Sequence, residues 1–167
     1  MKLEKAIFAC GCFWGAQYQF EHAKGVVRST VGYIGGHKEH PAYEEVKAHT
    51  TGHAEATLVE FDAEQTSFTE LCKLFFEIHD PAQTDGQGPD IGPQYRSEIF
   101  YLNDKQKEEA EAVIALLREK GYEVNTKLTP ATTFWEGEEY HQHYYDKTGG
   151  EPSVSYTHLT LPTNSLV

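Results

Sequence analysis

The sequence predicts a single α+β domain, in which helices and strands are mixed along one chain. With 167 residues, the chain has the length of one domain and is long enough to bury a proper core. Short apolar runs that suit strands are separated by segments whose apolar residues recur at the period of a helix. We find no internal repeat, and no apolar run approaches the roughly 18 residues of a membrane span.

The first third of the chain predicts a strand, a helix and a second strand. Residues 4–10 contain an apolar run and are expected to form the first strand. In the segment 13–24, apolar residues share one helical face, and Gly25 would end that helix. Residues 26–33 form the second predicted strand. The segment 35–53 is rich in Gly, His, Pro and Thr and is expected to be a long loop, which in a compact domain is often functional.

The remaining elements follow from capping and periodicity. Ser67 and Glu70 have the spacing of a capping box, which predicts a helix over 68–79. The segment 104–120 is amphipathic and predicts a second long helix. Further strands are expected over 54–62, 96–102 and 123–128, with a second long loop over 81–95.

The charge of the chain excludes several kinds of partner. There are 26 acidic and 14 basic residues, which give a net charge of −12, and no basic stripe is present. This argues against nucleic acid and against an anionic membrane surface. No signal-peptide pattern opens the sequence, and three cysteines, an odd number, do not suggest a disulfide framework. We therefore expect the reducing environment of the cytoplasm. We also expect the protein to be a monomer.

Residues 9–15, with the sequence ACGCFWG, are the most informative stretch. Cys12 lies where the first strand passes into the first helix. Free backbone N–H groups and the positive end of the helix dipole would favour a thiolate there. The large aromatic residues Phe13 and Trp14 could wall an apolar pocket beside the sulfur. A buried, inert cysteine in a glycine-flanked turn is the alternative.

Glu55 is a candidate general acid. In the predicted strand 54–62 it shares a face with Thr57, Val59 and Phe61. A carboxyl on an apolar face loses hydration, which raises its pKa. Such a group keeps its proton near neutral pH and can donate it during a reaction. A solvated glutamate at the end of a strand is the alternative.

Three polar residues of the two long loops are weaker candidates. Tyr43 belongs to the loop over 35–53, while Asp90 and Tyr95 belong to the loop over 81–95. Tyrosines are common at half-buried surfaces without any chemical role, and aspartate is an ordinary turn residue.

Six short segments occur in an order that points to one family. They are GCFWG at 11–15, GYIGG at 32–36, GHAE at 52–55, HDP at 79–81, QYRS at 94–97 and YHQ at 140–142. Together they resemble the peptide-methionine (S)-S-oxide reductases, which are the A-type methionine sulfoxide reductases. The resemblance extends from about residue 4 to about residue 152.

The resemblance implies chemical roles for four of the candidates. Cys12 corresponds to the nucleophile that attacks the sulfoxide sulfur and becomes a sulfenic acid. Glu55 corresponds to the acid that protonates the sulfoxide oxygen. Tyr43 and Tyr95 correspond to residues that donate hydrogen bonds to the same oxygen.

The resemblance also implies how substrate is bound and which fold carries the site. Phe13 and Trp14 would hold the terminal methyl group, and Asp90 would help to bind the substrate. The expected fold is a ferredoxin-like mixed sheet with packed helices and an open site. The expected reaction is reduction of the S epimer of methionine sulfoxide, free or within proteins. The family implies no bound cofactor or metal, and an external thiol reductant such as thioredoxin, glutaredoxin or dithiothreitol.

Two other functions fit parts of the sequence. Cys10 and Cys12, with four histidines of the loop over 35–53, could form a zinc or copper site. Only one residue separates the cysteines, however, whereas zinc sites prefer about two to four. A thiol sensor without turnover would also use an activated Cys12, but it would not need an acid and two tyrosines directed at one oxygen. A metal assay and a turnover assay separate these functions.

The end of the sequence differs from the rest. Residues 152–167 contain no Asp, Glu, Lys or Arg and are dominated by Thr, Ser, Leu and Pro. We expect a reductase domain over 1–152 and a tail over 153–167 outside the catalytic fold. The tail is either a divergent terminus or foreign sequence from cloning or a shifted reading frame. Family members often carry recycling cysteines near the C-terminus, whereas here none follows Cys72, which we expect to be an inert core residue.

Overall fold

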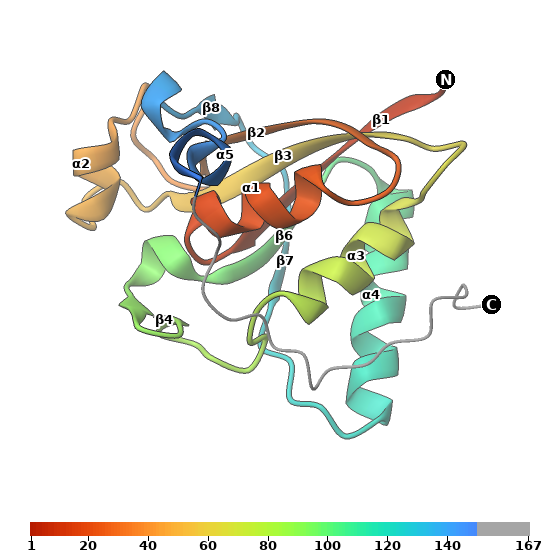
Figure 1. Ribbon diagram of the computed structural model, residues 1–167. Helices are drawn as coiled ribbons and strands as arrows, with labels where there is room; N and C mark the ends of the chain where they lie inside the picture. The colour runs from red at the N-terminus through yellow and green to blue at the C-terminus, as the bar shows by residue number, and fades with distance from the viewer. Residues whose placement is uncertain (150–167) are drawn as a thin grey trace.

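The computed structural model describes residues 1–149, so the predicted boundary at 152 and the predicted tail lie outside the described residues. The main sheet contains β1 (Leu3–Cys10), β2 (Val26–Ile34), β3 (Ala54–Asp62), β6 (Ser97–Tyr101), β7 (Lys127–Pro130) and β8 (Trp135–Glu136). The helices are α1 (Phe13–Glu21), α2 (Tyr43–Lys47), α3 (Phe68–Glu77), α4 (Asp104–Glu119) and α5 (Tyr144–Thr148). Figure 1 shows this α+β arrangement.

The sheet has the ferredoxin-like topology that the resemblance implies. The order β1-α1-β2-β3-α3-β6 along the chain gives four central strands in the spatial order β6-β1-β3-β2. Every neighbouring pair among these four is antiparallel, which is the split βαβ arrangement. The edge strand β7 pairs parallel with β6, so the sheet is mixed. The fold class predicted from the sequence is therefore confirmed.

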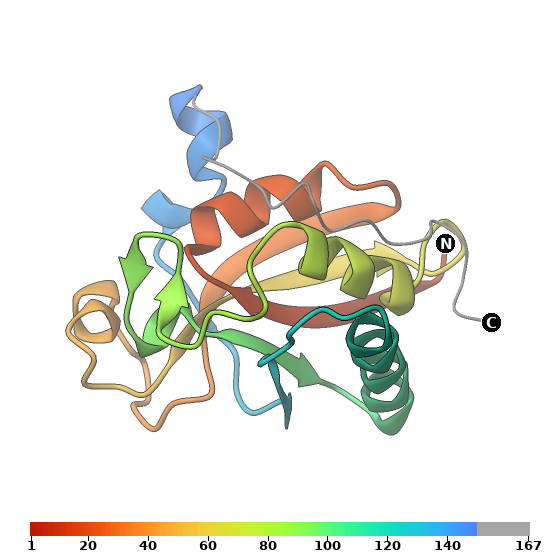
Figure 2. The same ribbon diagram turned by 90° about the horizontal axis from the view of Figure 1, so that it is seen from below.

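Helices α1, α3 and α4 supply the main core against one face of the sheet (Figure 2). Phe8 lies fully buried at its centre and stacks on Phe20, Phe68 and Phe75, with ring centroids 5.0, 5.8 and 5.3 Å away. Since burying one such ring stabilises a fold by about 1.5–3 kcal/mol, this cluster anchors α1 firmly on the sheet. The helix that begins beside Cys12 thus has a fixed position.

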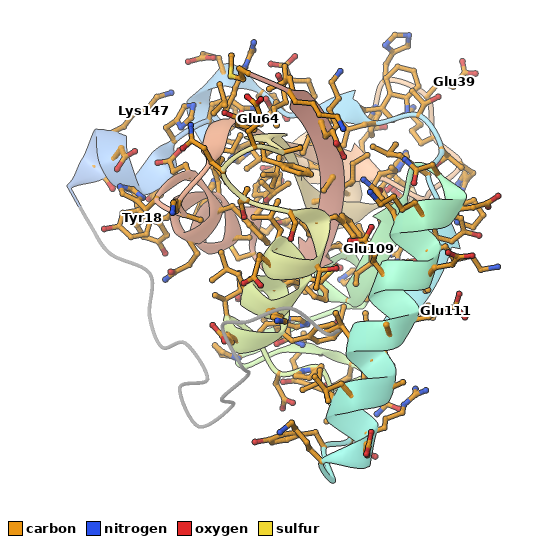
Figure 3. All side chains as sticks on the ribbon, turned by 90° about the vertical axis from the view of Figure 1, so that its right-hand side faces the viewer. Tyr18, Glu39, Glu64, Glu109, Glu111 and Lys147 are labelled. Carbon is orange, nitrogen blue, oxygen red and sulfur yellow. The ribbon has the colours of Figure 1, made fainter. Side chains whose placement is uncertain are left out.

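Polar contacts set the start of α3 and join it to α4. The Ser67 hydroxyl accepts the N–H of Glu70 at 3.1 Å, as the capping-box spacing predicts. The Thr69 hydroxyl donates to the Glu109 carboxylate of α4 at 2.7 Å. Figure 3 shows the two helices side by side, with Glu111 pointing away from the molecule.

The strand predicted over 123–128 is wrong in position, because β7 spans Lys127–Pro130. Val124 is buried in the core beneath the helices instead of pairing in the sheet. The Asn125 N–H donates to the carbonyl of Pro81 at 2.7 Å. The chain needs these residues to return from α4 to the edge at which a parallel strand can pair with β6.

The two predicted loops contain short regular elements. The first holds α2, and the second holds a two-stranded ribbon of β4 (Gly86–Gln87) and β5 (Asp90–Ile91), followed by the 3-10 turn η1 (Pro93–Tyr95). A second 3-10 turn, η2 (Glu139–His141), precedes α5. Within residues 1–149, no helix combines the length and apolar character needed to cross a bilayer.

Candidate active site

Cys12 is the residue at which β1 turns into α1. It is the N-cap of α1 and has extended backbone geometry, as the sequence predicts. The turn depends on Gly11, whose φ of +101° is one that side chains rarely adopt. A Cβ at Gly11 would also lie 2.9 Å from the Cβ of Gln87. The thiol of Cys12 is only partly exposed.

The ionisation of Cys12 differs from the expectation. The backbone N–H groups of Trp14 and Gly15 do stabilise the thiolate, as a helix N-terminus should. Burial and the negative charges of Glu55 and Asp90 outweigh these groups and raise the pKa of Cys12 to about 12. At neutral pH, Cys12 is therefore a thiol and not the thiolate that the helix start alone would favour.

Glu55 lies in β3 with its side chain in the core. It is 1% exposed, and Thr57, Val59 and Phe61 on the same face are also buried, as the period-two pattern predicts. Glu55 Oε1 accepts the N–H of Phe13 at 3.1 Å, which places the carboxyl at the start of α1. Burial raises the pKa of Glu55 to about 8 despite this hydrogen bond, and Asp90 adds to the rise. Glu55 therefore carries a proton at neutral pH.

Tyr43 and Tyr95 approach this point from the two long loops. Tyr43 is the first residue of α2 and Tyr95 is the last residue of η1, and both are half-buried. Burial raises the pKa of Tyr43 to about 12 and that of Tyr95 further, and the charge of Glu55 is the next cause for both. Both phenols therefore remain protonated and can act as hydrogen-bond donors near Glu55 and Cys12.

Phe13 and Trp14 form an aromatic cluster with the C-terminal part of the described chain. Phe13 is 1% exposed, and its ring lies 5.2 Å from that of His141. Trp14 is half-buried and donates its indole N–H to Nδ1 of His141 at 3.0 Å. Its ring stacks on Tyr144 of α5 at 3.8 Å. Trp14 is thus partly open to solvent, whereas Phe13 is buried beneath this cluster.

Asp90 lies in β5, close enough to Cys12 and Glu55 for its charge to act on both. It is exposed, and the ribbon pairs it with Gln87, whose side chain contacts the backbone of Asp80. An exposed carboxylate at the rim can accept a hydrogen bond from a substrate.

Sequence reasoning missed the residues that hold this cluster together. Glu138 accepts hydrogen bonds from the Tyr33 hydroxyl at 2.7 Å and from the Tyr43 N–H at 2.9 Å. His141 is buried and accepts the indole N–H of Trp14. Only the YHQ segment at 140–142 drew attention to this region, and no local pattern connects Glu138 with a tyrosine 95 residues earlier.

The ligand set suggested for a Cys–His metal site does not gather in residues 1–149. His53 is buried and uses both ring nitrogens within its own loop, at the N–H of Gly36 and the carbonyl of Lys38. The described residues whose donor atoms do converge are Glu21, His143 and Asp146, at the other end of α1. Neither cysteine takes part in that group.

A thiol at a helix start, a protonated buried carboxyl and two tyrosine hydroxyls suit an oxidoreductase that works through cysteine. Comparisons with known proteins identify the family of oxidoreductases to which the chain belongs. A sequence model of the family described as peptide methionine sulfoxide reductase matches residues 4–164, past the expected boundary at 152. The peptide methionine sulfoxide reductase MsrA of Acinetobacter baumannii (strain AYE) is 43% identical over 164 residues, which cover 98% of this chain and 93% of that protein.

Solved structures agree with the sequence comparisons. Mxr1 of Saccharomyces cerevisiae in its reduced form superposes with a TM-score of 0.83 at 34% identity, covering 91% of this chain and 89% of that one. Mxr1 in complex with Trx2 gives a TM-score of 0.59 at 25% identity, covering 86% and 85% of the two chains. The chain belongs to the peptide methionine sulfoxide reductase family. It is an oxidoreductase, a peptide-methionine (S)-S-oxide reductase.

Proposed function

We propose that Cys12 reduces the S epimer of methionine sulfoxide, free or within proteins, by attacking the sulfoxide sulfur and becoming a sulfenic acid. The position of Glu55 carries this proposal. Its buried, protonated carboxyl is held at the start of the helix that Cys12 caps. A sulfoxide needs a nucleophile at sulfur and a proton at oxygen, and these two residues supply them from adjacent positions.

Substrate binding follows from the two sides of the site. Trp14 and Phe13 contact the terminal methyl group, while Tyr43 and Tyr95 donate hydrogen bonds to the sulfoxide oxygen. Asp90 binds the substrate from the rim. An apolar wall on one side of the sulfur and donors on the other distinguish the two epimers, because exchanging methyl and oxygen would leave the donors unpaired.

The chemical step moves one oxygen atom and two electrons. As Cys12 sulfur bonds to the sulfoxide sulfur, Glu55 gives its proton to the oxygen, and the tyrosines stabilise the charge that develops there. The hydroxyl oxygen then moves from the substrate sulfur to the Cys12 sulfur. A sulfur–oxygen bond to Cys12 forms while the sulfur–oxygen bond of the substrate and the transient sulfur–sulfur bond break, and the methionine thioether leaves with two more electrons. The oxygen remains on Cys12 as a sulfenic acid. The proton that leaves the thiol replaces the one that Glu55 donated.

An external thiol completes the cycle. The sulfenic acid takes up two electrons from a reductant such as a thioredoxin and releases water. The complex of the related Mxr1 with Trx2 supports a protein reductant of this class. We propose that the protein works as a monomer in the cytoplasm, where such thiols are kept reduced.

The test is turnover on resolved epimers. The protein is incubated with each epimer of methionine sulfoxide and dithiothreitol, and methionine formation is followed. We expect the S epimer alone to be consumed, and Cys12→Ser to abolish turnover without unfolding the protein, because a hydroxyl is a poor nucleophile at neutral pH. Cys72→Ala is the matched control and should keep the activity. Substantial turnover by Cys12→Ser would refute the assignment of the nucleophile, and a single oxidation event without turnover would favour a sensor.

A further inference from the structure

Glu138 joins two tyrosines that come from distant parts of the chain. It is half-buried and immediately precedes η2. Its Oε1 accepts the hydroxyl of Tyr33 at 2.7 Å, and its Oε2 accepts the backbone N–H of Tyr43 at 2.9 Å. Both carboxylate oxygens are therefore used, and the two hydrogen bonds span 105 and 95 residues of sequence.

The contact to Tyr43 lies at the first residue of α2, a helix that depends on contacts with the rest of the protein. This helix has five residues, which is too short to be stable without tertiary contacts. Its preceding residue, Ala42, has no side chain that can cap the helix, and its backbone is bonded to Glu45 instead, through the Glu45 N–H and the Glu45 carboxylate at 3.0 Å each. The N–H of Tyr43 is not part of these bonds and is one of the groups that a helix leaves without an internal partner. Glu138 supplies an acceptor for the N–H of Tyr43, the residue whose hydroxyl we assign to the sulfoxide oxygen.

The contact to Tyr33 connects the same carboxylate to a rigid point of the sheet. Tyr33 is fully buried in β2, and in the antiparallel pairing it lies directly opposite Glu55 of β3. Its ring also packs against Phe13, with centroids 5.7 Å apart. One carboxylate thus links the segment 35–53, through Tyr43, to the residue of β2 that lies opposite Glu55.

We propose that Glu138 is a positioning residue that holds the Tyr43 hydroxyl in the same site as the Glu55 carboxyl. The inference rests on the proposed function, because it assigns Tyr43 as a donor to the sulfoxide oxygen. Glu138 acts only through Tyr43 and does not touch the substrate. A displacement of about 1 Å at such a donor is enough to weaken catalysis strongly.

The proposal is tested by double-mutant kinetics on the S epimer. Because Tyr95 can partly replace a lost donor, Glu138→Ala alone should reduce kcat only about as much as Tyr43→Phe alone. In a Tyr43→Phe background, Glu138→Ala should cause no further loss. In a Tyr95→Phe background, it should reduce kcat at least about tenfold more than in the wild type, as expected for residues that act through one group.

Controls separate positioning from general destabilisation. Glu138→Gln should restore most of the rate, since its amide oxygen can still accept the Tyr43 N–H. Glu139→Ala changes the exposed neighbour, which pairs with Lys147, and should leave kcat unchanged. If Glu138→Ala folds poorly, Tyr33→Phe releases the same carboxylate and should show the same coupling more weakly. Amide hydrogen exchange at Tyr43, read by NMR, should accelerate in Glu138→Ala and not in Glu139→Ala.

Two results would overturn the inference. If Glu138→Ala lowers kcat by the same factor in all three backgrounds, its role is only structural, while the proposed function stands. If Tyr43→Phe combined with Tyr95→Phe leaves kcat unchanged, the donor assignment in the proposed function fails, and the positioning role fails with it. Turnover that survives Cys12→Ser would instead refute the nucleophile.

Discussion

Glu55 keeps its proton because β3 places the carboxyl among apolar side chains, where one N–H donor does not replace lost hydration. In Glu55→Gln, the amide can still accept the Phe13 N–H and donate a hydrogen bond to the sulfoxide oxygen, but it cannot transfer a proton. We expect kcat to fall by about 10²–10⁴-fold, with a small change in KM. Steady-state kinetics on the S epimer measure both. A rate within a few-fold of wild type would mean that the proton comes from another group.

The same carboxyl should make stability depend on pH. The pKa of Glu55 is raised from an ordinary 4.5 to about 8, so between these values the folded protein holds a proton that the unfolded chain has lost. Stability contributed by this group is therefore complete below about pH 4.5 and declines as the pH rises toward 8.

Glu55→Gln removes this titration. We expect the free energy of unfolding of the variant, relative to wild type, to increase by on the order of 3 kcal/mol between pH 5 and pH 8. Urea unfolding at several pH values measures the difference. Parallel curves for the two proteins would show that Glu55 is already ionised in the folded state.

At the scale of elements, the contact between α1 and α5 fixes Trp14, which we propose as a wall of the methyl pocket. Trp14 stacks on Tyr144 at 3.8 Å and donates to His141 at 3.0 Å. Trp14→Ala should raise KM by about 10–200-fold, since one methyl in such a pocket is worth about 1–3 kcal/mol. Trp14→Phe keeps the ring and loses the N–H, so it should retain most of the affinity. An unchanged KM in Trp14→Ala would assign the indole to the core.

The long elements were predictable because their own sequence carries the signal. The apolar face of α1, the Ser67 cap of α3 and the alternation of β3 all appear in the structure as predicted. The short elements could not be predicted in this way. They are α2 and α5, with five residues each, and the two-residue strands β4 and β5. Elements this short depend on tertiary contacts, and their sequences are too short to show a helical or strand periodicity. The strand predicted over 123–128 was misplaced for a related reason. Val124 is apolar because it is buried in the core, and not because it belongs to a strand of the sheet.

The residues of the candidate site also divide into those with a signal in the local sequence and those without one. Cys12 and Glu55 stand out by local pattern, since one marks a junction and the other interrupts an apolar face. Tyr43 and Tyr95 gained a role only through the family resemblance, because loop residues have no periodicity. Glu138 was missed altogether, since its partners lie 95 and 105 residues away. A contact of that range becomes visible only once the chain is folded.

At the scale of the whole molecule, the arrangement of cysteines bears on how the proposed sulfenic acid would be reduced. Cys10 and Cys72 are both buried in the main core, and neither forms a disulfide. Burial raises the pKa of Cys10 to about 12 and that of Cys72 well above its ordinary value, and both side chains pack in the main core. Within the 167 residues, no cysteine follows Cys72.

We therefore predict that Cys12 remains a sulfenic acid until an external thiol reduces it. Cys10 is two residues away, and in an extended segment its Cα would lie about 6.6 Å from that of Cys12, near the upper limit for a disulfide. Reaching Cys72 would require α3 to leave its place on the sheet. After one turnover without reductant, intact-mass spectrometry should show a gain of one oxygen, or one adduct of a sulfenic-acid trap, that is absent in Cys12→Ser. A loss of two hydrogens, with a peptide map joining Cys12 to Cys10 or Cys72, would instead reveal an internal resolving cysteine and a core that opens during the catalytic cycle.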